Sequence, residues 1–518
     1  MRDCGLQFGT SDFGHNLLQP LQMLSALCIF QNTDRQQRPL FRFVMKAFDK
    51  QMIKPNGGLG RHAIVIGGSI AGLLAARVLS EYFQQVTIVD RDTFSENSGA
   101  RKGVPQGQHV HVIFGGGMQV IDRLFPGFSD ELAANGSVVC DFAKELCWYH
   151  AGVWKARPES DLTSYWQSRP FLEANLRQRL KSDTDVRIRD KSSVVGLHTD
   201  SEKSRITGVE IRSGESDGAT EHLAADLVID ASGRGSQTPK WLESLGYQRP
   251  DETTVEVNIG YASRDYEPSH DDSRDWQIMA LYGTPPDSTR TGYIFPIEGG
   301  RWRVSEVGFL NDVPPDDDEG FLEFARSLER PDLYEAIRNA KPLTPISTFR
   351  FPADKWRRYD HMSRFPAGLL VIGDAICTFN PVYGQGMSAC ALEVEELRLL
   401  LEACPGGNAV PDNLYKKFFR RTAKVIEIPW MLATQSDFLY PQSRGKRLLH
   451  TNALNWYLVR VLRLCSGNDR ITKTFYEVLH FIKKPTAFFH PSVLSAVLTR
   501  ALGFKGLYMH CKQRPSRT

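Results

Sequence analysis

A glycine-rich turn near residue 70 is the first stretch of this chain whose residue types and spacing could do chemistry. The turn is Gly67-Gly68-Ser69-Ile70-Ala71-Gly72, and it lies between the apolar run Ala63 to Ile66 and a segment with helical periodicity. Glycines here let backbone N–H groups approach a phosphate at a helix N-terminus, where unpaired donors and the helix dipole favour negative charge. This pattern predicts a dinucleotide-binding turn. A structural glycine turn in another α/β protein is the alternative for this motif alone.

The residues after the second apolar run suit the same ligand. Asp90 follows Val86 to Val89 and precedes Arg91, and a carboxylate at the end of that strand can accept hydrogen bonds from a ribose. Ser69 takes the place of the middle glycine of G-x-G-x-x-G. Serine is the smallest replacement and its hydroxyl could hydrogen-bond a phosphate, so we expect it to be tolerated.

Two later strands also run into turns of small residues. The apolar run Leu227 to Asp230 continues into Ala231-Ser232-Gly233-Arg234-Gly235, and Leu369 to Ile372 continues into Gly373-Asp374-Ala375. A loop with Gly384 and Gly386 then precedes a helical segment, which predicts a second glycine-lined helix N-terminus. Open α/β sheets bind ligands at such strand ends. Three glycine-bearing strand ends would be an odd coincidence in an arbitrary α/β protein.

Length and composition indicate a globular protein with more than one domain. A chain of 518 residues is too long for one hydrophobic core, and its 41% hydrophobic and 24% charged residues are ordinary for a soluble protein. Nine cysteines without a C-x-x-C pair favour reduced thiols over a disulfide framework or a zinc ribbon. We therefore expect a reducing, cytoplasmic location. No stretch reaches the roughly 20 apolar residues that span a bilayer.

Charge is unevenly distributed along the chain. The net charge is +3, but from Leu401 onward 19 lysines and arginines face 6 acidic residues. Such a basic region can face an anionic membrane surface or a nucleotide, whereas a solvated helical face is the plainer alternative. Peripheral membrane contact through this region stays open, and we expect no nucleic-acid partner.

Two clusters invite a metal interpretation that their surroundings do not favour. His109 and His111 stand two residues apart without a third ligand of fitting spacing nearby. The acidic run Asp316 to Glu319 precedes a helical run, Phe321 to Leu328, and fits helix capping and dipole roles better. We expect no metal site.

The order of apolar runs and turns predicts five segments. They are an N-terminal extension without assigned chemistry (1–60), the first part of a nucleotide-binding domain (61–239), a β-sheet substrate domain (240–350), the return of the nucleotide-binding domain (351–405) and a helical C-terminal region (406–518).

The third turn carries the most specific resemblance to a known family. Gly373-Asp374 followed by Pro381-x-x-Gly384-x-Gly386-Met387, with the two earlier turns and with Arg169 in R-x-x-L-x-x-x-L, resembles the fingerprints of FAD-dependent monooxygenases of the aromatic-hydroxylase and squalene-epoxidase type. The resemblance covers residues 61 to 400. It implies an α/β fold, a Rossmann-like FAD-binding domain with an inserted β-sheet substrate domain and a helical C-terminal region.

The resemblance also implies roles for single residues. Asp374 would hydrogen-bond the FAD ribityl chain, Arg169 would contact the FAD, and Asp90 would take the ribose-binding position. The second helix start would face the flavin pyrimidine, where donors and a positive dipole end stabilise negative charge on the reduced ring. The predicted cofactor-binding residues are Gly67, Gly68, Ser69, Gly72, Asp90, Arg91, Arg169, Asp374, Gly384, Gly386 and Met387. No catalytic residue is assigned.

The middle turn departs from the family pattern. Aromatic hydroxylases usually have an Asp-Gly pair, associated with both FAD and NAD(P)H, where this chain has Ser232-Gly233. NADPH or NADH is therefore expected as electron donor either directly or through a separate flavin reductase. The chain also lacks the W-x-W-x-I-P signature of flavin halogenases.

The expected function is that of a flavoprotein monooxygenase in secondary-metabolite biosynthesis. Reduced FAD and O2 would hydroxylate or epoxidise an apolar organic substrate, bound between the flavin and the substrate domain, with Tyr261, Arg264 and Tyr293 as candidate wall residues. The alternatives are a reductase or desaturase of prenyl chains, similar to geranylgeranyl reductases, and a non-catalytic flavoprotein. Substrate, site of oxygenation and oligomeric state are left open.

Overall fold

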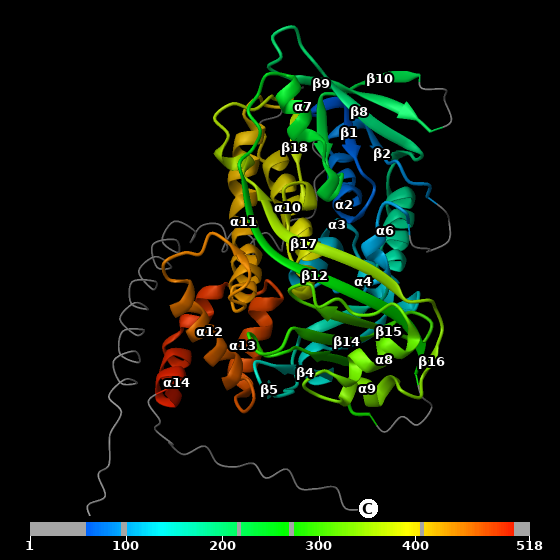
Figure 1. Ribbon diagram of the computed structural model, residues 1–518. Coiled ribbons are helices and arrows are strands. Elements are labelled where there is room, and N and C mark those ends of the chain that lie inside the picture. The colour runs from blue at the N-terminus through cyan, green and yellow to red at the C-terminus, as the bar shows by residue number, and fades with distance from the viewer. Residues whose placement is uncertain (1–57, 95–100, 215–218, 269–273, 405–408, 502–518) are drawn as a thin grey trace, which may run out of the picture.

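The computed structural model describes residues 58–94, 101–214, 219–268, 274–404 and 409–501 (Figure 1). Residues 1–57 of the predicted N-terminal extension lie outside this part of the chain, as does the predicted boundary at residues 405 and 406. The described part builds a parallel sheet and a larger, mainly antiparallel sheet, which lie at opposite ends of the molecule in Figure 1.

The parallel sheet has five strands in the order β18-β11-β1-β2-β7. Its strands are β1 (Gly60–Ile66), β2 (Phe83–Val89), β7 (Arg187–Arg189), β11 (Leu227–Asp230) and β18 (Leu369–Val371). Ile64, Val65 and Val228 are fully buried in it. Parallel strands that are covered on both faces read as continuous apolar runs, which is why the sequence predicts them well.

Helices pack against this sheet and against one another. They are α2 (Ile70–Leu79), α3 (Gly115–Leu124), α4 (Phe128–Ala134), α6 (Arg169–Asp183), α7 (Thr238–Ser244), α10 (Gly386–Glu402) and α11 (Leu414–Asp437), with the short α5 (Phe142–Glu145) between strands. The buried α10 contacts α2, α3 and α11. A small antiparallel sheet of β8 (Ser192–Thr199), β9 (Ile206–Ser213) and β10 (Thr220–Ala224) extends from this end.

The larger sheet has ten strands along the path β19-β17-β12-β15-β14-β13-β4-β5, with β16 and β20 paired to β12. The strands are β4 (Leu146–His150), β5 (Val153–Trp154), β12 (Glu252–Glu267), β13 (Ile278–Leu281), β14 (Arg290–Ile297), β15 (Arg301–Gly308), β16 (Lys341–Pro342), β17 (Ser347–Arg357), β19 (Cys377–Thr378) and β20 (Arg444–Gly445). The long strands β12 and β17 run together across the middle of the molecule (Figure 1). The separate strands β3 (Val138–Asp141) and β6 (Thr163–Trp166) pair with each other.

One face of the larger sheet is covered by α8 (Asp318–Arg326) and α9 (Asp332–Ile337), whose Phe321 and Leu333 pack with Tyr266 of β12. The Asp317 carboxylate caps α8 by accepting from the Gly320 N–H at 2.8 Å. This acidic run therefore has the capping role that the sequence indicated.

The larger sheet extends beyond the predicted substrate segment of 240–350. It takes β4 and β5 from residues 146–154, inside the segment assigned to the nucleotide-binding domain, and β17 continues to Arg357. β4 pairs with β13 in parallel over a long separation in sequence. A short aromatic run indicates a strand but carries no local signal for such a distant partner.

The C-terminal helices lie beside the larger sheet, below α11 in Figure 1. They are α12 (Thr451–Leu464), α13 (Asp469–Leu479) and α14 (Pro491–Ala501), with the 3-10 turn η7 (Pro485–Phe489). The His480 carbonyl accepts from the Gly116 N–H at 2.8 Å, and the Cys465 carbonyl accepts from the Ala156 N–H at 2.7 Å. The predicted fold class is confirmed: an α/β Rossmann-like domain, a sheet domain and C-terminal helices. No helix of the described chain is long and apolar enough to cross a membrane.

Candidate active site

One cavity of about 660 Å³ lies between the carboxyl ends of the parallel strands and the larger sheet. Strand ends are where an open parallel sheet leaves room for a ligand. Nine of the eleven predicted cofactor-binding residues line the cavity: Gly67, Ser69, Asp90, Arg91, Arg169, Asp374, Gly384, Gly386 and Met387. Gly68 and Gly72 do not line it, because the Gly68 N–H is directed at Asp90 and Gly72 faces the Gly67 carbonyl from within α2.

The first turn needs its glycines for backbone geometry. Gly67 has φ +99°, a left-handed conformation that disfavours other residues. A Cβ on Gly72 would lie 1.8 Å from the Gly67 carbonyl oxygen, so α2 can approach β1 only with hydrogen at this position. The Gly68 N–H donates to Asp90 Oδ2 at 2.6 Å, which joins the ends of β1 and β2.

Ser69 takes part in a buried charged network instead of pointing its hydroxyl freely at a ligand. Its hydroxyl donates to Glu173 of α6 and accepts from Arg169 Nη2 at 2.9 Å. Glu173 also pairs with Arg169 at 3.0 Å and with Arg101 at 2.6 Å. Burial alone would raise the pKa of Glu173, but the two guanidinium groups outweigh it and hold this pKa at about 2. The expectation of a free phosphate-binding hydroxyl at Ser69 is therefore replaced by a role in holding two arginines.

Asp90 keeps acceptor capacity toward the cavity. Its carboxylate accepts from the N–H groups of Gly68 and Asp92, and Arg101 Nη1 lies 3.6 Å from Oδ2. An ionised carboxylate has about four lone-pair positions, so a ribose hydroxyl can still donate to it. Arg91 is exposed at the rim of the same region.

Asp374 is the clearest unused ligand group of the cavity. Its carboxylate makes no hydrogen bond within the described chain, although it lines the cavity and burial raises its pKa above the usual value. The turn that carries it is fixed because the Gly373 N–H donates to Glu393 of α10 at 2.7 Å. A partly buried carboxylate without a protein hydrogen-bond donor can accept from ligand hydroxyls, so this group suits a ligand that carries them.

The start of α10 leaves space for a ligand. Gly384 has φ +67°, and a Cβ there would lie 2.6 Å from the Val112 side chain. A Cβ on Gly386, the first helical residue, would meet no atom within 4 Å and so would enter open space. The free N–H groups of the first helical turn border the cavity at this point.

In the middle turn, the acidic residue Asp230 is hydrogen-bonded to residues of the turn itself. Asp230 is fully buried and accepts from the hydroxyls of Ser232 and Ser236 at 2.5 Å and of Thr238 at 2.6 Å. Arg357 bridges this turn to the third one by donating to the carbonyls of Arg234 and Ala375. Both turns therefore lie at a fixed separation across the cavity.

A buried pair of carboxyl groups supports the loop between Asp374 and α10. Asp437 at the end of α11 accepts from Asn380 Nδ2 at 2.7 Å and from the Tyr383 hydroxyl at 2.9 Å. Asp354 of β17 accepts from the Asn380 N–H at 2.5 Å. Burial and mutual repulsion raise the pKa of Asp354, and burial raises that of Asp437 to about 6. The pair therefore shares a proton at mildly acidic pH.

The remainder of the cavity, which we call the substrate chamber, is formed by one face of the larger sheet and by the C-terminal helices. Its walls are Leu146, Trp148 and His150 of β4, Tyr261 of β12, Ala280 and Tyr282 at β13, Tyr293 and Phe295 of β14, Phe349 and Phe351 of β17, Leu432 and Ser436 of α11, Leu458, Val461 and Leu462 of α12, Phe475 and Leu479 of α13, and Phe488. Most strand residues in this set are two apart, as one face of a sheet requires.

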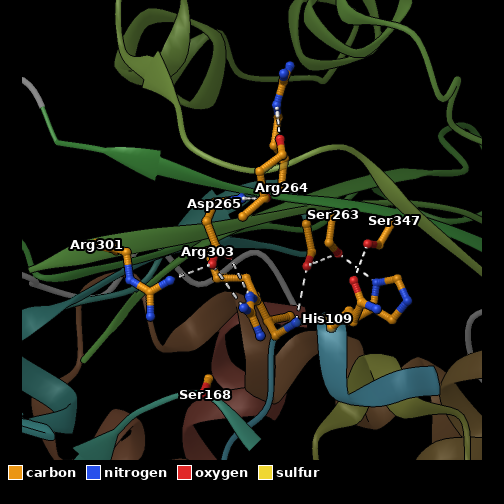
Figure 2. Close-up of polar contacts among 12 residues, drawn as sticks. His109, Ser168, Ser263, Arg264, Asp265, Arg301, Arg303 and Ser347 are labelled. Atoms are coloured by element: carbon orange, nitrogen blue, oxygen red, sulfur yellow. Dashed lines mark hydrogen bonds and ion pairs between the residues drawn. The ribbon is translucent and has the colours of Figure 1, made fainter. Parts of the chain in front are cut away.

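Two of the three residues that the sequence analysis predicted as substrate-pocket walls face the chamber. Tyr261 and Tyr293 line the chamber, but Arg264 does not, and its prediction as a wall residue was wrong. Tyr261 and Arg264 are three positions apart, so they point to opposite faces of the strand. Figure 2 shows Arg264 directed away from Ser263 and His109, and its guanidinium pairs with Asp318 at 2.7 Å.

The loop that carries His109 and His111 is tied to the larger sheet. His109 Nδ1 lies 2.7 Å from the Ser263 hydroxyl, and Asp265 binds both Arg303 and Arg301 beside it (Figure 2). Burial lowers the pKa of His109 to about 4 and that of His111 to about 3, so both rings are neutral at physiological pH. His111 lies at the Arg169 guanidinium, with 3.4 Å between nitrogens.

Taken together, the donor set on the parallel-sheet side fits FAD. Arg169, Arg101 and Arg91 bring positive charge to the side of the first turn, and a pyrophosphate carries negative charge. Asp90 and the unpartnered Asp374 offer acceptors for sugar and ribityl hydroxyls, and Gly386 leaves space at a helix N-terminus.

Arg101 and Glu173 are the site residues that sequence reasoning missed. Arg101 belongs to a loop without a characteristic spacing, so no pattern singles it out. Glu173 had a usable signal, because it stands four residues after Arg169 on one face of α6.

Comparison with known proteins agrees with this site. A family model described as an FAD binding domain matches residues 61–426. A relative from Mycobacterium tuberculosis (strain ATCC 25618 / H37Rv), Protein Rv3254, is 34% identical over 394 residues, which is 75% of this chain and 82% of the relative.

Solved structures share the fold at low sequence identity. PqsL from Pseudomonas aeruginosa, described as a probable FAD-dependent monooxygenase, is 16% identical with a TM-score of 0.52, over 73% of this chain and 98% of its own. The flavin-dependent brominase Bmp2 is 12% identical with a TM-score of 0.59, over 86% and 99%. At this level of identity the likeness concerns the fold alone, and the same fold carries different chemistries.

Proposed function

This chain belongs to the family of FAD-dependent monooxygenases that share the FAD binding domain, and from that premise we propose that it inserts one oxygen atom of O2 into an apolar organic substrate by hydroxylation or epoxidation. The observation that carries the proposal is the continuity of one cavity. It joins the unpartnered Asp374 and the glycine-lined start of α10 to a chamber walled by apolar and aromatic side chains.

Bound FAD would supply the reaction with O2, because no amino-acid side chain activates oxygen by itself. The chain's own residues have other tasks. Asp374, Arg169 and Arg101 would hold the cofactor, and the N-terminus of α10 would offer it backbone donors and a positive dipole end. The sheet face and the C-terminal helices exclude water from the reacting region, which protects an oxygen-transferring site from side reactions.

The source of electrons is part of the proposal. Direct reduction by NADPH or NADH and reduction through a separate flavin reductase are both compatible with Ser232-Gly233 in the middle turn. Anaerobic titration of the FAD-loaded protein with each nicotinamide, in the presence and absence of substrate, separates them. Bleaching of the flavin absorption by NADPH or NADH alone supports direct reduction.

The decisive experiment follows the oxygen atom. The FAD-loaded protein is reduced, mixed with 18O2 and a panel of uncharged aromatic and terpenoid compounds, and the products are analysed by mass spectrometry. One 18O atom per product molecule is the expected result. Saturation or desaturation of a prenyl chain without 18O would support the reductase alternative. A flavin that never turns over with any donor would support a non-catalytic flavoprotein.

A further inference from the structure

The loop between α11 and α12, residues 438–450, presents the two most exposed large apolar side chains of the described chain. Leu449 is 105% exposed, and Leu448 beside it is 52% exposed. A single exposed leucine is ordinary on a protein surface. Two adjacent ones form a small apolar patch, and apolar patches rimmed by polar residues mark interaction sites. The loop is therefore a candidate docking surface.

Polar contacts hold this loop in place, so a fixed support presents the leucines. Its strand β20 pairs with β12. The Arg447 guanidinium donates to the carbonyls of Phe438 at 2.8 Å and Tyr440 at 3.1 Å. The Leu448 N–H donates to Thr451 Oγ1 at 3.0 Å, and the Thr451 N–H donates back to the Leu448 carbonyl at 3.0 Å. The exposure of the two leucines is thus a property of a folded turn.

The surroundings of the patch in the sequence are basic. Residues 438–468 contain no aspartate or glutamate, and their lysines and arginines are Arg444, Lys446, Arg447, Arg460 and Arg463. Arg444 and Lys446 are exposed, and neither forms an ion pair with a residue that the structure describes. Glu256 lies opposite Arg444 in the pairing of β20 with β12 and offsets part of the charge. The loop therefore combines exposed leucines with available positive charge.

The loop leads directly into a wall of the substrate chamber. α12 begins at Thr451, and its Leu458, Val461 and Leu462 line the chamber. A stable protein interface buries about 800 Å² on each partner, far more than two leucines can offer. A few inserted apolar side chains with cations beside them are, however, enough for reversible binding to an anionic bilayer. Of these two partners, the lipid surface fits the patch better.

We propose that the loop 438–450 docks on an anionic membrane surface, with Leu448 and Leu449 inserted at the headgroup boundary and Lys446 beside the lipid phosphates. Such a surface offers an apolar interior for the leucines and negative charge for the cations. Docking there would bring α12, and with it the substrate chamber, to the membrane. Delivery of an apolar substrate from the membrane rests on the proposed function, whereas the docking itself does not.

Binding of the full-length, FAD-loaded protein to lipid vesicles tests the proposal, without any electron donor. The protein is sedimented with vesicles of phosphatidylcholine alone and with vesicles that contain about one-third phosphatidylserine. We expect at least about tenfold tighter binding to the phosphatidylserine vesicles. This preference should disappear in about 1 M salt, where the Debye length is only about 3 Å.

Two variants separate the apolar from the charged contribution. Leu449→Ser should weaken binding to phosphatidylserine vesicles about tenfold, because one leucine no longer leaves water. Lys446→Glu changes two units of charge and should weaken this binding about twentyfold, with binding to phosphatidylcholine alone within about twofold of the wild type. Because both side chains are exposed, both variants should keep the FAD content and the melting temperature of the wild type.

The matched controls carry the same substitutions elsewhere on the surface. Leu343→Ser changes a leucine that is 39% exposed directly after β16, and Lys181→Glu changes an exposed lysine of α6. Both elements lie on the side of the molecule away from α12 in Figure 1. The two control variants should bind phosphatidylserine vesicles as the wild type does.

Three results would overturn the proposal. The first is equal binding of the wild type to both kinds of vesicle, or binding to neither. The second is wild-type affinity in Leu449→Ser. The third is a wild-type dimer that Leu449→Ser converts into a monomer in analytical ultracentrifugation, because the leucines would then pack against a second copy. No turnover enters these measurements, so a failure to incorporate 18O would count against the proposed function and leave the membrane docking standing.

Discussion

The two sides of the cavity differ in the charge of their side chains: the cofactor side is rich in charged groups, and the substrate chamber is mainly apolar and aromatic. On the cofactor side, Glu173 lies between Arg101 and Arg169, and the charges of Arg169, Arg234 and Arg357 act on the Asp374 carboxylate. The substrate chamber is walled mainly by apolar and aromatic side chains, and the hydroxyls of Tyr282 and Tyr293 in it donate to the Val382 carbonyl.

This difference predicts that substitutions on the cofactor side reduce stability or FAD binding, whereas substitutions in the substrate chamber change which substrate binds. A charged network with fixed glycine geometry has one workable arrangement, so changes there cost folding or FAD. A wall of apolar and aromatic side chains tolerates changes of shape, so changes there alter which substrate binds. The predictions below test whether the two sides are separable in this way.

The largest effect is expected at Gly72. Any side chain there overlaps the Gly67 carbonyl, since even a Cβ would lie 1.8 Å from that oxygen. Gly72→Val should give insoluble protein or soluble protein without FAD, measured by the yield and by the flavin absorbance of the purified fraction. Gly467→Val is the control, because a Cβ at Gly467 meets nothing within 4 Å. Normal FAD content in Gly72→Val would contradict a dinucleotide turn.

Asp374→Ala should come next, with loss of FAD from a folded protein. The carboxylate has no protein partner to lose, so its removal costs the cofactor contacts alone. Two charge-assisted hydrogen bonds correspond to at least about a hundredfold weaker FAD binding. Fluorescence titration of the apoprotein with FAD measures this change, and Asp251→Ala on the exposed surface should match the wild type. A variant that purifies with full FAD would remove Asp374 from the cofactor site.

The same contrast explains how much the sequence could predict. The cofactor side follows from local patterns, because strand, turn and helix are contiguous in the chain: Gly67 to Gly72 and Gly373 to Gly386 each carry their own spacing. The chamber is assembled from β4, β12 and β14 and from helices after residue 413, and no spacing links Trp148 to Tyr261 or Val461. Alternation could have separated Tyr261 from Arg264, but the sequence does not reveal which face of the sheet meets the cavity.

Glu173→Gln should cost stability mainly on the cofactor side. Two arginines would then lie buried with less negative charge between them, which is expected to lower the free energy of unfolding by about 3 kcal/mol. The pKa of Glu173 is about 2 in the folded chain and near 4.5 when unfolded, so its contribution is present above pH 4.5 and is lost as the pH falls toward 2.

Thermal melts of apoprotein and FAD-loaded protein from pH 3 to 7 measure the effect of Glu173→Gln. The gap between wild type and variant should close toward acidic pH. It should also be smaller with FAD bound, because the pyrophosphate supplies negative charge to the same arginines. Exposed Glu202→Gln, in the turn between β8 and β9, is the control and should show no gap at any pH.

The smallest effect is expected for Asp437→Asn, which sharpens the comparison because its pH dependence has the opposite sign. The Asp437 pKa is about 6 in the folded chain and near 3.8 when unfolded, so its pairing with Asp354 is complete below pH 3.8 and is lost as the pH rises through 6. An asparagine keeps the oxygen that accepts from Asn380 and Tyr383, and its amide can donate to Asp354 as the shared proton does.

The variant should therefore fold, retain FAD within about twofold of the wild type, and melt with less dependence on pH between 4 and 7. Melting curves at these pH values measure the slope, and a variant as pH-sensitive as the wild type would mean that this pair does not share a proton. Because the carboxyl pair weakens as the pH rises through 6 and the Glu173 network weakens as the pH falls below 4.5, the loop before α10 and the first turn have a common range of greatest stability at mildly acidic pH.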